Sequence, residues 1–141
     1  MIIPDINLLV YAYNQDAPYH AAARRWWESL CNRREPIGLP WVVNCGFIRV
    51  MTHPGIMTHP LHPKAALAHV RSWLVRSHIQ TVDPGPRHLE ILTHLLDTLG
   101  IAGNLTTDAH LAAIAIEYQG EVQSNDSDFE RFPGLRCSNP L

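Results

Sequence analysis

Residues 121–129, EVQSNDSDF, place a short alternation of apolar and polar residues directly before a run of Asn, Asp and Ser side chains. The alternation predicts a strand, and the polar run that follows it has two interpretations. Asn, Asp and Ser hydrogen-bond their own backbone and are frequent in turns. Carboxylates at the end of a strand are also the ligands that a hard divalent cation needs. The segment leaves both interpretations open, so the decision depends on partners elsewhere in the chain.

The rest of the chain alternates short apolar runs with longer helical periods, which predicts an α/β fold with a parallel sheet. No linker or low-complexity stretch divides the 141 residues, so we expect a single domain. We expect a cap at Thr107 or Asp108 for one helix, and ends at Gly100 and Gly120 for two. The expected strands are 1–4, 37–40, 78–84, 121–124 and 135–139, and the expected helices are 7–13, 19–34, 41–53, 63–77, 86–100 and 106–120.

The composition is that of an ordinary globular protein, with 46% apolar and 17% charged residues. No apolar run approaches the roughly 20 residues that cross a bilayer, so no membrane association is expected. The first residues lack the basic leader of a signal peptide. The three cysteines are far apart and show no Cys-x-x-Cys spacing, which argues against a zinc site or disulfide framework. These features predict a cytoplasmic protein.

The net charge of −2 conceals an uneven distribution along the chain. Residues 19–76 carry a net charge of +6, whereas residues 77–141 carry −6. A basic middle and an acidic end suit a polyanionic substrate held beside a metal-binding acidic pocket. Two solvated surfaces of opposite charge would produce the same distribution, so the charge alone does not decide.

Four aspartates share one predicted location. Asp5 follows the first strand, Asp126 and Asp128 follow the fourth, and Asp108 begins a helix. Ligands of open parallel sheets bind beyond the carboxyl ends of the strands, so these side chains meet if the first and fourth strands are neighbours. Carboxylate ligands of this kind select Mg²⁺ or Mn²⁺ over zinc or copper. Helix caps at Asp5 and Asp108 and turns at Asp126 and Asp128 are the alternative interpretation.

Three stretches together resemble PIN-domain ribonucleases, specifically the VapC toxins of bacterial VapBC toxin–antitoxin pairs. They are PDINLLVYAYN (4–14), GNLTTDAHLAAIAIEYQ (103–119) and SNDSDFERFPGL (124–135), and their order and spacing cover nearly the whole chain. The resemblance implies one PIN-like domain, residues 1–141, folded as a three-layer α/β/α sandwich around a short, mainly parallel sheet. It also implies a homodimer and a cognate VapB-like antitoxin that blocks the active site.

The resemblance assigns the family's acidic residues to Asp5, Asp108 and Asp126 as catalytic residues and metal ligands, with Asp128 as an accessory ligand. One position departs from the family, which commonly has a Glu in the helix after the second strand. Here the run is GFIR, and Gly46 stands where that carboxylate is expected. The departure predicts one strongly bound ion and a second that arrives with the substrate.

The function expected from these residues is Mg²⁺- or Mn²⁺-dependent hydrolysis of RNA phosphodiesters by an endoribonuclease that acts as a growth-arresting toxin. Asn7 and Thr107 are candidates for orienting the carboxylates. Basic side chains of the middle region are candidates for contacts with RNA phosphates, which give affinity without sequence choice. These candidates are Arg24, Arg25, Arg33, Arg34 and Arg49.

Two alternatives remain open at the level of the sequence. An Asp after the first strand and an acidic pair later in the chain also resemble Mg²⁺-dependent phosphohydrolases that use an aspartate nucleophile. Against this alternative, Asn7 stands where such enzymes have a second Asp. A PIN fold that lacks the Glu could instead bind RNA or an antitoxin without cleaving RNA.

Overall fold

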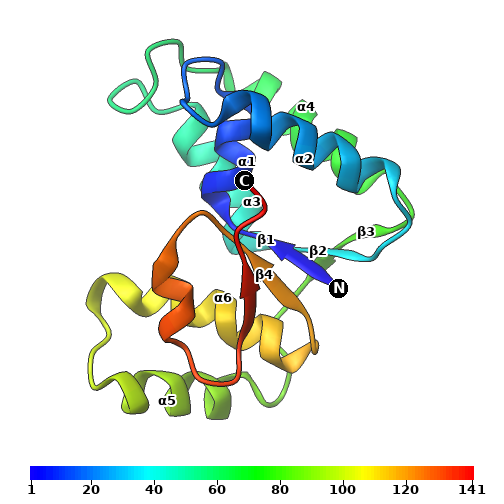
Figure 1. The fold of residues 1–141 in the computed structure, drawn as a ribbon. Coiled ribbons are helices and arrows are strands. Elements are labelled where there is room, and N and C mark those ends of the chain that lie inside the picture. Colours follow the sequence, from blue (N-terminus) through cyan, green and yellow to red (C-terminus); the bar gives the residue numbers. More distant parts are fainter.

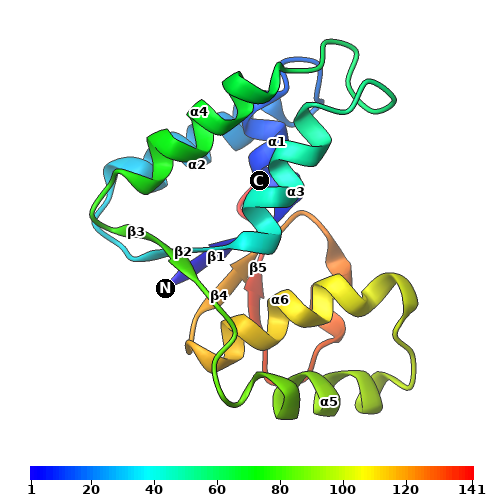
Figure 2. The same ribbon diagram turned by 180° about the vertical axis from the view of Figure 1, so that it is seen from behind.

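The computed structural model describes residues 1–141 and contains a five-stranded sheet between two layers of helices (Figure 1). All neighbouring strands are parallel, and their order is β3-β2-β1-β4-β5. Helices α1 to α4 lie on one side of the sheet and α5 and α6 on the other, as the reverse view in Figure 2 also shows. The predicted α/β/α architecture with a parallel sheet is therefore confirmed.

The elements follow the alternation predicted from the sequence, with boundaries that differ by a few residues. The strands are β1 (Ile2–Pro4), β2 (Ile37–Pro40), β3 (Ile79–Val82), β4 (Glu121–Gln123) and β5 (Arg136–Ser138). The helices are α1 (Ile6–Tyr13), α2 (His20–Asn32), α3 (Trp41–Met51), α4 (Pro63–Leu74), α5 (His88–Leu99) and α6 (Thr106–Glu117), with short 3₁₀ helices η1 (Gly103–Leu105) and η2 (Ser127–Arg131). No helix is long and apolar enough to cross a membrane.

The hydrophobic core lies on both faces of the three central strands. Ile3 of β1, Leu39 of β2 and Val122 of β4 have no exposed surface. Strands β1 and β2 are buried along their whole lengths, because helices cover both faces of a parallel sheet. The core thus fixes the ends of these strands in space, and the backbone of the residues just beyond them is held in place as well.

The first and fourth strands are neighbours, which is the condition that the predicted acidic site requires. Pro4 of β1 is in register with Gln123 of β4. The pairing continues one step further, since the Asp5 amide donates to the Gln123 carbonyl at 2.9 Å. The chain leaves β1 toward β2 and β3 on one side and returns to β4 on the other, so the strand order reverses between β1 and β4. Ligands of open α/β sheets bind at this kind of position.

The capping of α6 differs from the prediction, although the helix begins at the predicted residue, Thr106. We expected Thr107 or Asp108 to cap this helix, but α6 begins at Thr106 and both residues lie inside its first turn. The 3₁₀ helix η1 runs directly into α6, and the residue before the helix, Leu105, offers no side-chain cap. The prediction of a cap was therefore wrong, and Asp108 is free of that role. The prediction for Gly100 is confirmed, because it ends α5 with a φ of 69°.

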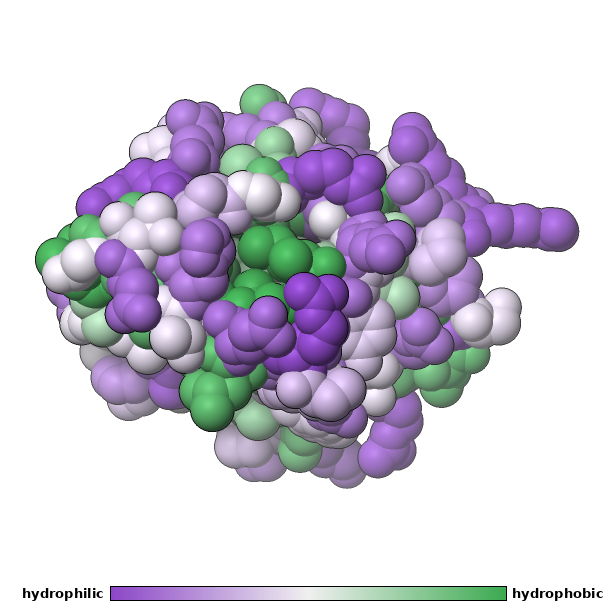
Figure 3. Space-filling model, turned by 90° about the horizontal axis from the view of Figure 1, so that it is seen from below, coloured by the Kyte–Doolittle hydropathy of each residue, from purple (hydrophilic) through white to green (hydrophobic).

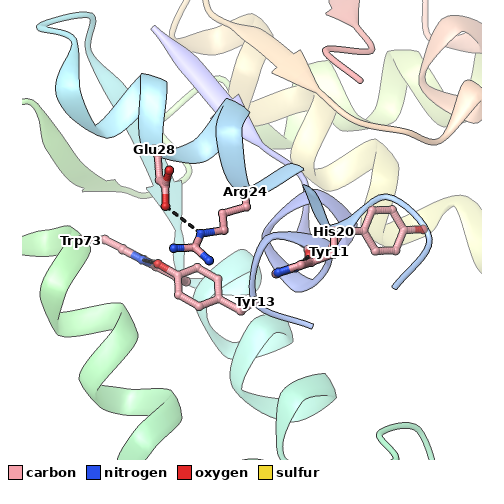
Figure 4. A network of polar contacts seen from close by, with 6 residues as sticks. All are labelled: Tyr11, Tyr13, His20, Arg24, Glu28 and Trp73. Atoms are coloured by element: carbon pink, nitrogen blue, oxygen red, sulfur yellow. Dashed lines mark hydrogen bonds and ion pairs between the residues drawn. The ribbon is translucent and has the colours of Figure 1, made fainter. Parts of the chain in front are cut away.

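Polar contacts join the helices on the upper side of the sheet (Figure 4). The Trp73 indole of α4 donates to the Tyr13 hydroxyl of α1 at 2.8 Å. Trp27 of α2 packs edge-on against Trp73, with ring centroids 5.5 Å apart, and both indoles are almost completely buried. This region is an aromatic core in which the donor of Trp73 has a partner, which is the usual condition for a buried indole.

The lower side of the molecule carries the α5–α6 pair. Figure 3 views this side and shows apolar residues gathered near the centre with hydrophilic residues around them. Ile91 and Leu95 of α5 and Ile116 of α6 line a hollow there, next to the turn at Pro133 and Gly134. At the far end of α6, Glu117 accepts hydrogen bonds from two backbone amides of the β3–α5 connection. These contacts join the C-terminal end of α6 to the β3–α5 connection.

Candidate active site and metal centre

Ser124 joins the ends of β1 and β4. Its hydroxyl donates to Oδ2 of Asp5 at 2.7 Å, and its oxygen accepts from the Asp126 backbone amide at 2.9 Å. The other carboxylate oxygen of Asp5 accepts from the Ile6 amide at 2.7 Å, which caps α1. Asp5 and Ser124 are both buried, so these hydrogen bonds hold the Asp5 carboxylate in one orientation. Asp5 therefore caps α1 and also lies at the edge of the sheet where the candidate site is.

Asn7 lies beside this pair, and its side-chain amide donates to the Ser124 hydroxyl oxygen at 3.3 Å. The side-chain oxygen of Asn7 is buried without a hydrogen-bond partner. Thr107, the other candidate for orienting the carboxylates, is exposed, and its hydroxyl makes no hydrogen bond. The contact of Asn7 thus runs through Ser124 rather than directly to a carboxylate.

Three carboxylates converge beside Asp5 from different elements. Asp108 comes from the first turn of α6, Asp126 follows β4, and Asp128 lies in η2. One oxygen from each lies within 4.8 Å of the others. Asp126 also caps η2, since its carboxylate accepts from the Asp128 amide at 2.9 Å. The closest group therefore includes Asp128, which the sequence suggested only as an accessory ligand.

Burial and mutual repulsion perturb the carboxylates of this group. Burial is the largest cause and repulsion from Asp5, Asp126 and Asp128 adds to it, and together they raise the pKa of Asp108 to about 6. Burial also raises the pKa of Asp5, with repulsion from Asp126 adding to it and hydrogen bonds from Ser124 and Ile6 opposing it. A helix N-terminus favours a negative charge, yet at Asp108 burial and repulsion outweigh that effect. The four aspartates thus form one electrostatic unit.

This arrangement fits a hard divalent cation. All the donors are carboxylate oxygens, and they approach one another closely enough to share one ion. A cation would remove the repulsion that raises the pKa of Asp108. Mutual repulsion without a cationic partner is unfavourable for folding, so the convergence is better explained by a ligand than by stability alone.

Ile6 fills the space beside Gly46. A Cβ atom at Gly46 would lie 2.3 Å from Cδ1 of Ile6 and 2.9 Å from its Cγ1. A glutamate at position 46 would therefore collide with the first turn of α1 unless Ile6 moved. Helix α3 contains no aspartate or glutamate. The side-chain amide of its buried Asn44 donates to the Leu39 carbonyl at 3.4 Å. The acidic group lacks a contribution from α3.

The five arginines predicted to contact RNA are spread over α2, the α2–β2 connection and α3, and each of them is exposed. Arg24 pairs with Glu28 of the same helix at 2.8 Å, as Figure 4 shows. Arg25 and Arg33 line an open groove together with Trp26. None of the five forms an ion pair with an aspartate of the site. Their contact with RNA stays a prediction.

Two residues at the site were missed by the sequence analysis. Ser124 could have been found from the strand register, because the residue after β4 lies opposite the residue after β1. Arg131 ends η2, and its Nη1 lies 3.8 Å from Oδ1 of Asp128. Asp128 and Arg131 are three residues apart in a short turn, and this spacing was the only signal in the sequence for their contact.

Comparison with known proteins identifies the class. A family model described as the PIN domain matches residues 2–135. Ribonuclease VapC33 of Mycobacterium tuberculosis is 45% identical over 141 residues, covering 100% of this chain and 99% of that protein. Ribonuclease VapC37 of the same organism is 38% identical over 140 residues, covering 99% and 97%. The chain therefore belongs to the PIN-domain family. Within it, the chain is a member of the VapC ribonucleases, and the resemblance seen in the sequence is confirmed.

Solved structures agree on the fold. A crystal structure of Mycobacterium tuberculosis VapC20, described as a Sarcin-Ricin loop cleaving toxin, matches with a TM-score of 0.68 at 16% identity, covering 96% of this chain and 99% of that one. VapBC2 from Rickettsia felis, bound to a DNA fragment from its promoter, matches with a TM-score of 0.68 at 21% identity, covering 99% and 98%. PIN nucleases generally depend on divalent metal ions, and the acidic group described above is consistent with that dependence.

Proposed function

We propose that this protein is a Mg²⁺- or Mn²⁺-dependent endoribonuclease that hydrolyses RNA phosphodiesters as the toxin of a toxin–antitoxin pair. The observation that carries the proposal is the convergence of Asp108, Asp126 and Asp128 beside Asp5 at one edge of the sheet. Full-length similarity to proteins named ribonucleases supports it.

In this proposal each aspartate has a defined task. Asp108, Asp126 and Asp128 hold the divalent ion, with Asp5 next to them. Such an ion lowers the pKa of a bound water and supports charge on the scissile phosphate. Asp5 is kept in place by the Ser124 hydroxyl and the α1 amide, so it needs no reorganisation when RNA arrives. Ser124 and Asn7 are positioning residues that act through Asp5 and the Asp126 backbone.

The same proposal includes partners. We infer a VapB-like antitoxin, a homodimer, and action on RNA in the cytoplasm, with residues 1–141 as a single PIN domain. The fold neighbours that support an antitoxin include VapBC-1 from nontypeable Haemophilus influenzae and a DNA-bound VapBC from Salmonella typhimurium, with TM-scores of 0.66.

The test is incubation of purified, antitoxin-free protein with total RNA, with Mn²⁺ or with a chelator, followed by mapping of the cut ends. Cleavage should require the ion, and Asp5→Asn should abolish it. Asp16→Asn is the matched control, because Asp16 is exposed and its only ion-pair partner is His59, outside the site. Cleavage that persists in the chelator or in Asp5→Asn would overturn the proposal.

A second candidate is a catalytically weak PIN fold that binds RNA or an antitoxin. Helix α3 contributes no carboxylate to the acidic group, and Ile6 occupies the space beside Gly46, which favours this candidate. RNA binding without any cleavage in excess Mn²⁺ would support this candidate. A phospho-aspartate intermediate during turnover of a small phosphoester would instead support the phosphohydrolase.

A further inference from the structure

We propose that Arg131 is the cationic residue that receives an RNA phosphate at the acidic site. In the absence of RNA its guanidinium faces Asp128, and binding of the divalent ion and RNA transfers it to a phosphate oxygen. The inference rests on the proposed nuclease function and adds a substrate-binding residue to it.

The position of Arg131 is set by the same short turn that presents the acidic group. Asp128 and Arg131 are three residues apart in η2, and side chains at this spacing lie on the same side of a 3₁₀ helix. The neighbouring Phe129 and Phe132 are almost fully buried and anchor the turn in the core. The backbone therefore holds Arg131 beside the carboxylates whatever its side chain contacts.

The contact between Arg131 and Asp128 is loose. The Nη1–Oδ1 distance of 3.8 Å exceeds the length of a hydrogen bond, and the Arg131 side chain is 45% exposed. Arg24, by contrast, makes a 2.8 Å hydrogen bond to Glu28. A guanidinium has five N–H donors, and none of those of Arg131 makes a hydrogen bond within the protein. Its donors are free for a planar, two-pronged contact with a phosphate.

The negative charge of the site gives the Arg131 guanidinium a function. Four aspartates lie where the phosphodiester must approach, and they repel a polyanion unless positive charge is nearby. Arg131 is the only lysine or arginine that forms an ion pair with any of them. The predicted RNA contacts of α2 and α3 would bind phosphates elsewhere along the strand.

The geometry also makes Arg131 and the divalent ion competitors for Asp128. A cation bound to Asp128 repels the guanidinium and releases it toward solvent, where the RNA backbone arrives. Removal of Arg131 should therefore strengthen ion binding and weaken RNA binding. A residue that only supported the fold would weaken both, so opposite changes are the signature of this proposal.

The test compares Arg131→Gln with Arg71→Gln, which removes the same charge from an exposed position on α4 outside any site. Calorimetric titration without RNA measures the Mn²⁺ affinity of each protein. For Arg131→Gln we expect the Kd for Mn²⁺ to fall by about two- to five-fold, which is the size of an exposed ion pair. Arg71→Gln should leave the Mn²⁺ affinity unchanged.

RNA affinity is then measured by fluorescence anisotropy with Ca²⁺ in place of Mn²⁺, over a range of salt concentrations. Arg131→Gln should weaken binding by about ten-fold or more and reduce the slope of log Kd against log salt by about one. Arg131→Lys should restore part of the affinity, since the charge returns without the two-pronged donor.

Unchanged RNA affinity and salt slope in Arg131→Gln would overturn the inference, as would a parallel loss of Mn²⁺ and RNA binding. If the wild-type protein still cleaves RNA with Mn²⁺ in that case, the proposed function stands and only the role of Arg131 fails. A wild-type protein that binds neither Mn²⁺ nor RNA would overturn both.

Discussion

The aromatic region between α1, α2 and α4 and the acidic edge of the sheet both contain buried polar groups, but the contacts between those groups differ. In the aromatic region the buried indole of Trp73 donates to the Tyr13 hydroxyl, while the indole N–H of Trp27 is buried without a partner. On the exposed face of α2, Arg24 pairs with the opposite charge of Glu28 (Figure 4). At the acidic edge, Asp108 and its neighbours bring like charges together, and the pKa of Asp108 rises to about 6.

The difference shows where the fold gains stability and where it gives stability up. A satisfied hydrogen bond contributes about 0.5–1.5 kcal/mol to folding, whereas crowded like charges oppose folding. Substitution in the aromatic region should thus cost stability and leave the chemistry intact. Substitution at the acidic edge should abolish the chemistry and leave stability equal or higher. The following four predictions test this contrast.

The largest effect is expected for Asp126→Asn. The change removes a proposed ion ligand and should reduce the rate of RNA cleavage by at least about 10²–10³-fold, the range seen when one preorganised electrostatic group is lost. The Tm of the metal-free protein should stay equal or rise, because repulsion with Asp108 and Asp5 is relieved. Cleavage assays and thermal melts with a chelator measure both. A large fall in Tm would contradict the contrast between the regions.

Tyr13→Phe probes the aromatic region. It leaves the indole N–H of Trp73 without its acceptor in a buried position, which should cost about 1–3 kcal/mol. Chemical denaturation measures the free energy of unfolding, and cleavage per folded molecule should remain at the wild-type level. Tyr19→Phe is the matched control, since the Tyr19 ring is exposed. A specific loss of cleavage would show that the two regions are coupled.

Gly46→Ala tests the packing beside the acidic edge. Overpacking against Ile6 should cost about 1–3 kcal/mol, and the better helix propensity of alanine should return about 1 kcal/mol. We therefore expect a net loss of about 1 kcal/mol in the free energy of unfolding. In the Ile6→Ala background the same change should become neutral or stabilising. Additive effects in this double-mutant cycle would show that the two side chains do not share the space.

The smallest effect is a pH dependence of the metal-free protein. The pKa of Asp108 is about 6 in the fold against an ordinary value of 3.8, so the folded protein binds this proton more tightly than the unfolded chain. Stability is therefore highest below pH 4 with respect to this group and is lost as the pH rises through 6. Partial exposure limits the change to about 1 kcal/mol or less.

Thermal melts between pH 4.5 and 7.5 with a chelator measure this dependence. Asp108→Asn should flatten the profile, and Mn²⁺ at pH 7.5 should raise the Tm by binding only the folded state. If the Tm of the metal-free wild-type protein rose steadily between pH 5 and 7, and that of Asp108→Asn did not, the result would contradict this prediction.

Much of the fold was accessible from the sequence, because the local signals agree with the global arrangement. The alternation of strands and helices, Pro63 at the start of α4 and Gly100 at the end of α5 were all predicted. The cap of α6 at Thr107 or Asp108 was predicted wrongly, because a 3₁₀ turn continues directly into the helix at Thr106. Such a continuation depends on packing that no short pattern encodes.

At the site, the sequence identified the aspartates but not the residues that organise them. Asp5 and Asp126 stand out because each lies just beyond a predicted strand. Ser124 depends on the register of β1 with β4, and Arg131 on the geometry of η2, and both properties are three-dimensional. The absence of a glutamate at Gly46 was visible in the sequence, but the occupation of its space by Ile6 was not.

The packing of Ile6 against Gly46 has an evolutionary consequence. The two positions are distant in the chain but occupy one volume, so the effect of a change at either depends on the state of the other. A carboxylate acquired at position 46 first would require the Ile6 side chain to shift, at some cost in stability. With a smaller side chain already at position 6 the same change would meet no such contact, so the order of the two changes sets how much stability is lost between them.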